Sequence, residues 1–145
     1  IYSTFKVDGE HLYFVSTEWN SSYINRINKN GDIEKITTKG GSVDGFDICD
    51  GSILFIGLKD MKLQELYTIE DDIEIQLSTF NEWVIETKDI SKPERITFET
   101  ENGTTIEGWI LRPVDFDLHK KYPGILDIHG GPKTVYGEVF NLEMQ

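Results

Sequence analysis

The residues best suited to chemistry in this sequence are the consecutive His129, Gly130, Gly131 and Pro132. They directly follow residues 124–128, a short and mostly apolar run that predicts a strand covered on both faces. Acyl transfer needs backbone N–H groups aimed at the oxyanion that develops on the attacked carbonyl. Glycine lets a backbone come close enough to donate such a bond. The motif therefore predicts an oxyanion-binding loop, and the alternative is a glycine turn with an incidental histidine.

The nucleophile that such a loop serves is missing from the sequence. A hydrolase serine is usually presented in Gly-x-Ser-x-Gly, a sharp turn between a strand and a helix. None of the eight serines lies in that pattern, and the nearest approach, residues 41–45, has the wrong spacing. The serines are Ser3, Ser16, Ser21, Ser22, Ser42, Ser52, Ser78 and Ser91. We therefore expect the chain alone to be inactive.

The elements around the loop follow a recognisable order. Ile96, Phe98 and Thr100 alternate with polar residues, which predicts a half-buried strand. Asn102-Gly103 then predicts a hairpin turn into a strand over 105–111. After the 124–128 strand, apolar residues recur at spacings that suit an amphipathic helix, at Val135, Tyr136, Val139, Phe140 and Met144. A hairpin, a buried strand, a glycine turn and a helix are how an α/β-hydrolase sheet begins.

The first ninety residues predict an all-β region of short strands. The strands are expected at 11–15, 23–27, 33–37, 52–56, 65–69 and 73–77. Asp8-Gly9 recurs as Asp50-Gly51, and the same offset of 42 carries Ile24 onto Leu66, Ile27 onto Ile69 and Ile33 onto Ile75. Four short strands at this period indicate β-propeller blades, although any hairpin meander looks similar. Two blades cannot close a ring, so further blades are expected upstream. The polar stretch 88–93 reads as a linker.

The run from Pro93 to Gln145 resembles the start of the catalytic domain in the prolyl oligopeptidase family of serine peptidases, in its acylaminoacyl-peptidase and dipeptidyl-peptidase-like branch. The residues that carry the resemblance are Arg95-Ile96-Thr97-Phe98, Asn102-Gly103, Ile106-Glu107-Gly108-Trp109, Arg112-Pro113, Lys121-Tyr122-Pro123, Ile128-His129-Gly130-Gly131-Pro132, Tyr136-Gly137, Phe140 and Gln145. In that family a β-propeller precedes the catalytic domain, in agreement with the blades predicted above.

The resemblance implies a role for each residue of the loop. The backbone N–H of Gly131 would donate to the oxyanion, while Gly130 and His129 would support the loop. The family's catalytic histidine lies near the far C-terminus, so His129 is not expected to be the general base. The chain would comprise the last blades of a propeller, 1–92, and the truncated start of an α/β-hydrolase domain, 93–145. The parent would be a serine peptidase that cleaves short peptides through an acyl-enzyme, without a cofactor.

Two other functions remain open from sequence. A carboxylesterase or lipase usually has Gly at the fourth motif position, where this chain has Pro132, and lacks a preceding propeller. A non-catalytic propeller-type binding module would instead fold residues 93–145 as one more blade. A Gly-Gly-Pro turn that opens a helix fits that second alternative poorly.

Other candidate sites are weak. Asp127 and His129 could offer two metal ligands, but a site needs three or four. Residues 70–72 and Glu74 lack the spacing of a Ca²⁺ loop, so a solvated hairpin end is expected. The remaining expectations concern packing: Cys49 as a packing residue, Trp19, Trp83 and Trp109 in a core or between blades, and His11 and His119 solvated.

Composition limits the partners. With 14 basic and 26 acidic residues the net charge is −12, which disfavours nucleic acid as a partner. No run approaches the roughly 20 apolar residues of a membrane helix. The single cysteine fits a reducing, cytoplasmic setting. We expect a peptide substrate for the parent, no membrane partner and no metal, and self-association through exposed sheet edges.

Overall fold

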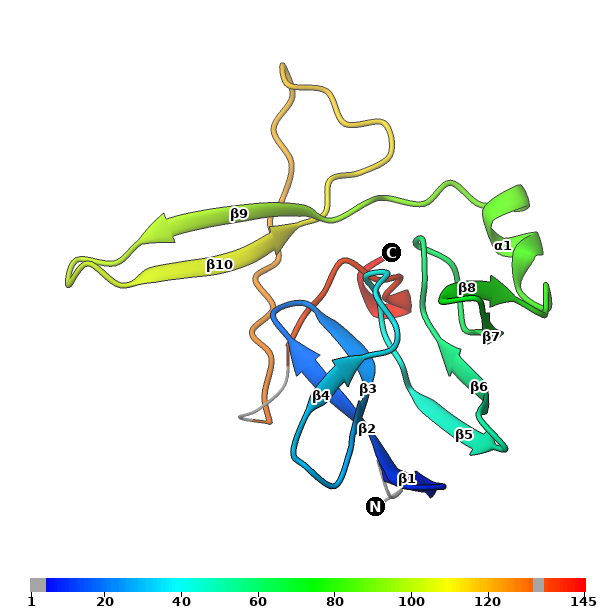
Figure 1. Cartoon of the computed structure of the whole chain (residues 1–145). Helices are drawn as coiled ribbons and strands as arrows, with labels where there is room; N and C mark the ends of the chain where they lie inside the picture. The colour runs from blue at the N-terminus through cyan, green and yellow to red at the C-terminus, as the bar shows by residue number, and fades with distance from the viewer. Residues whose placement is uncertain (1–4, 132–134) are drawn as a thin grey trace.

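The computed structural model describes residues 5–131 and 135–145 of the 145-residue chain. Its strands form two four-stranded sheets and one two-stranded sheet, all antiparallel (Figure 1). The first sheet contains β1 (Phe5–Asp8), β2 (His11–Glu18), β3 (Ser21–Ile27) and β4 (Ile33–Lys35). The second contains β5 (Gly45–Cys49), β6 (Ser52–Gly57), β7 (Glu65–Glu70) and β8 (Ile73–Gln76). Each sheet is a meander in chain order, which is the unit of a propeller blade.

In both blades a side-chain hydroxyl that follows the fourth strand accepts a hydrogen bond from the backbone of the third strand. In the first blade the Ile24 N–H donates to the buried Thr37 hydroxyl at 2.9 Å, and in the second the Leu66 N–H donates to the Ser78 hydroxyl at 2.9 Å. The repeat of 42 therefore holds for the third strand, but the offset falls to 41 at the fourth. The predicted match of Ile33 with Ile75 is off by one position, because the paired residues Ile69 and Glu74 are one residue closer in the chain than the equivalent pair, Ile27 and Ile33.

The hydrophobic core draws on both blades and on the segment between them. Its buried members are Tyr13, Ile24, Val43, Ile53, Phe55 and Tyr67. Phe55 and Tyr67 stack with ring centroids 5.2 Å apart. Alternate residues of β6 face this core, although the run from Ile53 to Ile56 is apolar throughout, so Leu54 and Ile56 are left exposed.

The connection between the blades, residues 38–44, is held by backbone contacts that require glycine. The Ser42 N–H donates to the Leu58 carbonyl at 2.9 Å, and the Ser22 N–H donates to the Gly41 carbonyl at 2.9 Å. A Cβ on Gly57 would lie 2.0 Å from the Ser42 oxygen, so the two segments could not pass this closely with any other residue. The Gly41-Ser42 segment is thus an inter-blade connector.

A buried ion pair fixes the same connection. The Lys59 ammonium lies 3.2 Å from Glu74 Oε2, and both side chains are almost fully buried, at 2% and 4% exposure. Glu74 Oε1 accepts from the backbone N–H groups of Thr38 and Lys39, each at 2.9 Å. Lys59 also donates to the Lys39 carbonyl at 2.9 Å. The second blade therefore contacts the backbone that leaves the first blade, at Thr38 and Lys39, through one buried carboxylate and one buried ammonium.

A short helix, α1 (Glu82–Thr87), follows the second blade, so the prediction that this region is all-β is wrong. Six residues are too few to give a visible helical period in the sequence. The turn before the helix is anchored by Glu65, whose carboxylate accepts from the Ser78 hydroxyl and from the N–H groups of Phe80 and Asn81. These bonds to a buried carboxylate lower the pKa of Glu65 against the opposing effect of burial.

The second part of the chain begins as predicted and then differs. Residues 88–93 carry no regular structure, and the expected hairpin forms from β9 (Glu94–Glu99) and β10 (Thr105–Ile110), with Gly103 at φ +80° in its turn. Figure 1 shows this hairpin beside the blades, outside either four-stranded sheet.

The buried strand expected at residues 124–128 does not form. Ile125 is 97% exposed and Leu126 84% exposed, and this segment is not in a sheet. A strand covered on both faces needs neighbouring strands and covering helices, and the described residues place none beside it. The helix expected from Val135 to Met144 is also wrong, because only a single 3₁₀ turn, η1 (Leu142–Met144), is present there. Phe140 is nevertheless buried.

Candidate functional site

The three described residues of the predicted loop lie together at the surface. His129, Gly130 and Gly131 are all exposed, and Gly131 has φ +128°, a conformation that side-chain-bearing residues rarely adopt. His129 Nδ1 lies 3.2 Å from the Gly130 carbonyl oxygen. The fourth motif residue, Pro132, lies outside the described residues. The loop is thus an exposed glycine turn, open to a partner, and its role as an oxyanion donor remains a prediction.

Tyr136 connects the two sides of this loop. Its hydroxyl donates to Asp127 Oδ2 at 2.8 Å, on the residue two positions before His129. Its ring meets the His129 ring edge-on, with centroids 5.5 Å apart and an interplanar angle of 89°. The hydrogen bond to the Asp127 carboxylate raises the pKa of the Tyr136 phenol. His129 therefore packs on the ring of Tyr136, beyond the loop, and its supporting role stays a prediction.

The segment after the loop is held to the rest of the chain at two points. The Trp109 indole N–H, on β10, donates to the Tyr136 carbonyl at 2.9 Å. A Cβ on Gly137 would lie 2.2 Å from the carbonyl oxygen of Asn20, in the turn between β2 and β3. Only glycine permits that approach. The loop is thereby connected to the hairpin and to the first blade.

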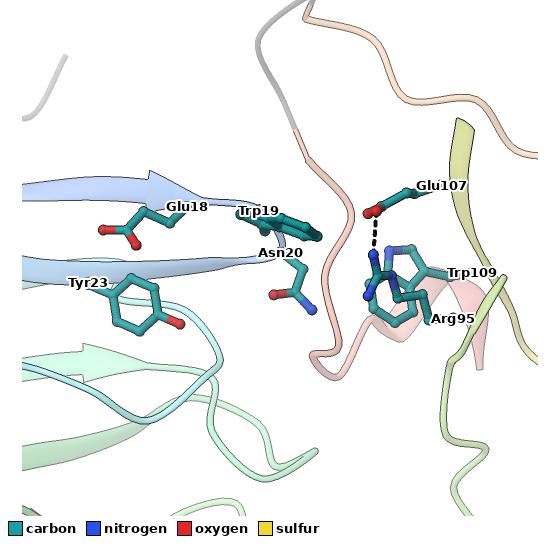
Figure 2. A pocket seen from close by; sticks show the side chains of 7 residues that line it. All are labelled: Glu18, Trp19, Asn20, Tyr23, Arg95, Glu107 and Trp109. Carbon is teal, nitrogen blue, oxygen red and sulfur yellow. Dashed lines mark hydrogen bonds and ion pairs between the residues drawn. The ribbon is translucent and has the colours of Figure 1, made fainter. Parts of the chain in front are cut away.

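A small cavity of about 250 Å³ lies at this junction (Figure 2). It is lined by Glu18, Trp19, Asn20, Tyr23, Arg95, Glu107 and Trp109. Arg95 forms an ion pair with Glu107 across the hairpin and lies 5.3 Å from the centre of the Trp19 ring. Figure 2 shows the dashed contact between these two charges, with both tryptophans beside it. Arg95 is already paired with Glu107, and the volume is below the usual range for ligand pockets. We therefore interpret the cavity as a gap where the first blade and the hairpin meet, and not as a ligand site.

The tryptophan expectations are not confirmed. Trp19 is 74% exposed and Trp83 is 54% exposed, so neither is a core residue. Trp19 occupies a turn position with φ +56°, where its ring covers Arg95. Trp109 is half-buried on the hairpin, where its indole N–H donates to the Tyr136 carbonyl, and it does not lie between the two blades. No local sequence signal pairs Trp19 with Arg95, because the contact depends on how the hairpin lies against the blade.

The weaker candidates also have definite places. Cys49 is exposed at the end of β5, so the packing interpretation is wrong. Glu74 is buried against Lys59, so residues 70–74 are not a wholly solvated hairpin end. Asp127 accepts from Tyr136, and no cluster of three or more metal-ligating side chains occurs in residues 5–131 and 135–145.

The two remaining histidines lie away from the loop. His11 is half-buried at the start of β2, with its ring 6.3 Å from that of Tyr13, rather than in a solvated turn. His119 is exposed in a polar loop, as expected, and its backbone N–H donates to Asp117 Oδ1 at 2.9 Å.

Comparison with known proteins identifies peptidases. No family model matches the chain. The chain is 32% identical over 141 residues to the uncharacterized peptidase YuxL of Bacillus subtilis, a match that covers 95% of the chain and 22% of the relative. It is 34% identical over 110 residues to a probable dipeptidyl-peptidase 5 of Aspergillus niger, covering 73% of the chain and 15% of the relative. The solved acylaminoacyl peptidase of Pyrococcus horikoshii superposes with a TM-score of 0.82 at 24% identity, over 99% of the chain and 22% of that structure.

The fold and the similar proteins together define the class of protein to which the chain belongs. The fold is mainly β, a partial β-propeller that leads into the first strands of an α/β-hydrolase domain. The chain belongs to the prolyl oligopeptidase family of serine peptidases, and it spans about a fifth of the length of the relatives it matches. The named relatives are peptidases, which disfavours the esterase alternative. The binding-module alternative predicted one more four-stranded blade after residue 92. The sheet formed by residues 94–110 has two strands, which contradicts it. None of the described helices is long and apolar enough to cross a membrane.

Proposed function

We propose that this chain is the part of a serine peptidase in which the last propeller blades, 1–92, lead into the catalytic domain, 93–145. The longer protein would hydrolyse short peptides. The observation that carries the proposal is the exposed His129-Gly130-Gly131 turn in a chain whose relatives are peptidases. The positive φ of Gly131 supports the proposal, because residues with a Cβ rarely adopt that conformation and a loop that needs it at this position needs glycine.

The chemistry would be acyl transfer to a serine outside residues 1–145. The serine oxygen would attack the peptide carbonyl while a base removes its proton, and the carbonyl oxygen would become an oxyanion. The Gly131 N–H would donate to that oxyanion, together with the N–H of the residue after the serine. The amine would then leave with a proton, and water would release the acyl group. Gly130 and His129 would support the loop without exchanging a proton with substrate.

The remaining partners follow from this proposal. Besides water, the only substrate would be a peptide, with no cofactor and no nucleic acid, and the protein would lie in the cytoplasm. The high exposure of Ile125, Leu126 and Ile128 supports self-association when the chain is alone, because apolar surface of this kind is rarely left in water. Sedimentation velocity would contradict that part of the proposal if the isolated chain stayed monomeric at high concentration.

The experiment compares two glycine substitutions in a longer gene product that contains this chain. Gly131→Ala forces a side chain onto a residue at φ +128°, so it should displace the donor. Gly124→Ala is the matched control, because a Cβ there meets no atom within 4 Å and φ lies outside the positive region. Loss of one oxyanion donor lowers kcat by about 10² to 10³. We expect that loss for Gly131→Ala on a peptide anilide, with little change in KM and in the melting temperature. A folded Gly131→Ala enzyme with the kcat of the control would overturn the proposal.

A further inference from the structure

Tyr136 makes three contacts that together enclose the candidate loop. Its hydroxyl bonds to Asp127 before the loop, its ring packs on His129 within the loop, and its carbonyl accepts from Trp109 on β10. These partners lie 9, 7 and 27 residues away in the sequence. The spacing of apolar residues assigned Tyr136 to the face of a helix, and that helix is not present.

The contact with Asp127 matters because of where it falls. Asp127 and Tyr136 lie on opposite sides of His129, Gly130 and Gly131, so one hydrogen bond ties together the two ends of the turn. The loop has few other restraints, since all three residues are exposed and a Cβ on Gly130 would meet nothing within 4 Å. An exposed turn with a glycine pair would otherwise sample many conformations. The tie therefore decides how well the Gly131 N–H is oriented.

The anchoring of Tyr136 itself is rigid. Its carbonyl is fixed by the Trp109 indole at 2.9 Å, on a strand of the hairpin. The next residue, Gly137, lies so close to the Asn20 carbonyl that a Cβ would be 2.2 Å away. The ring of Tyr136 is thus carried by backbone that contacts Trp109 on one side and Asn20 on the other.

We propose that Tyr136 is a positioning residue for the candidate oxyanion loop, acting through its hydrogen bond to Asp127 and its edge contact with His129. This inference rests on the proposed function for its catalytic consequence, but the positioning itself is a property of this chain. The phenol acts as a neutral donor to the carboxylate and takes no part in proton transfer. Tyr136 is therefore a residue that orients the Gly131 N–H without touching the substrate.

The first test measures the loop in the 145-residue chain, with ¹⁵N-labelled protein. Tyr136→Phe keeps the ring on His129 and removes only the hydroxyl. We expect lower heteronuclear NOE values at the amides of His129, Gly130 and Gly131, with the Trp109 indole signal unchanged. Asp127→Ala should have the same effect, and combining it with Tyr136→Phe should add nothing further. Asp127→Asn keeps an acceptor and should restore the wild-type values. Unchanged NOE values in Tyr136→Phe, or no rescue by Asp127→Asn, would overturn the positioning role.

The second test measures catalysis in the longer protein. A less ordered donor should lower kcat by about fivefold to tenfold in Tyr136→Phe, with KM changed by less than about twofold. The two tests separate the two ideas. A loop that loosens while kcat stays normal would contradict the oxyanion role of Gly131 and leave the positioning intact. A loop that stays ordered in Tyr136→Phe would contradict the positioning even if the enzyme is active.

Discussion

Lys59→Met tests how the two blades are held together. In the wild-type chain the ammonium of Lys59 lies 3.2 Å from a Glu74 carboxylate that is almost fully buried. The substitution keeps much of the aliphatic volume and removes the charge. Glu74 would then be a buried carboxylate that keeps its two backbone donors, the N–H groups of Thr38 and Lys39.

The expected magnitude follows from that geometry. Breaking a buried ion pair by removing one partner costs about 3–5 kcal/mol, because the remaining charge stays desolvated. The two backbone donors still stabilise the carboxylate, so the loss should fall at the lower end, about 3 kcal/mol. That is a large part of the roughly 5–15 kcal/mol that holds a domain folded. Glu74→Gln in the same chain should offset part of the loss, since the amide still offers an oxygen to Thr38 and Lys39.

Urea unfolding, followed by tryptophan fluorescence, measures the difference, and Lys29→Met provides the matched control. Lys29 makes a contact of 2.6 Å with Glu10, but both side chains are more than 70% exposed. An exposed pair contributes at most about 1 kcal/mol. We expect Lys29→Met to leave the midpoint nearly unchanged and Lys59→Met to lower it strongly at the same m-value. Equal midpoints for the two variants would refute the view that the buried pair clamps the blades.

Two further predictions concern the blades. Tyr67 is 5% exposed, and its hydroxyl has no hydrogen-bond partner among the described residues. Burial raises the pKa of the Tyr67 phenol to about 12, and the charges of Asp60, Glu65 and Glu74 add smaller effects in the same direction. Because the unfolded phenol titrates near pH 10, the fold favours the protonated form; this contribution is full below about pH 10 and is lost as pH rises toward 12. Tyr67→Phe should therefore abolish that alkaline loss and raise the free energy of unfolding at neutral pH by about 1 kcal/mol, and a lower value in urea titrations would contradict it. Gly57→Ala would place a Cβ 2.0 Å from the Ser42 oxygen and should lower the free energy of unfolding by at least about 2 kcal/mol. Gly45→Ala is the control, because its Cβ would have its nearest contact at 3.7 Å, and it should lower that free energy by less than about 1 kcal/mol. Equal melting temperatures for the two variants would show that the connector can move aside.

The sequence predicted the elements whose neighbours are close in the chain. β-Branched and aromatic residues and turn signals such as Asn102-Gly103 act locally, and they predicted β2, β3, β4, β6, β7 and β8 and the β9–β10 hairpin. The first strand of each blade, β1 or β5, was not predicted. The repeat of 42 located the second blade correctly, and it shifted by one position only at the fourth strand, where Ile69 and its partner Glu74 are one residue closer in the chain than Ile27 and Ile33. The exposed glycine turn at Gly130 and Gly131 also follows from residue types alone.

The remainder depended on contacts between distant residues. The run at 124–128 has the composition of a buried strand, yet composition cannot form a strand without neighbours to pair with. The burial of Glu74 depends on Lys59 and on the backbone of the preceding blade, none of which its own hairpin reveals. Tyr136 has helical spacing to its apolar neighbours, but its partners are Asp127, His129 and Trp109, so its role appeared only in three dimensions.

We propose that this chain supplies an oxyanion loop, and not the nucleophile, to a serine peptidase. The most direct measurement is fluorophosphonate labelling of two proteins side by side, the 145-residue chain and a longer gene product that contains it, with the labelled residue located by mass spectrometry. We expect stoichiometric labelling of the longer protein at one serine outside residues 1–145, with loss of peptide cleavage, and no labelling of the 145-residue chain. Labelling of any of the eight serines within the chain, or a longer protein that neither reacts nor cleaves a peptide anilide, would contradict it.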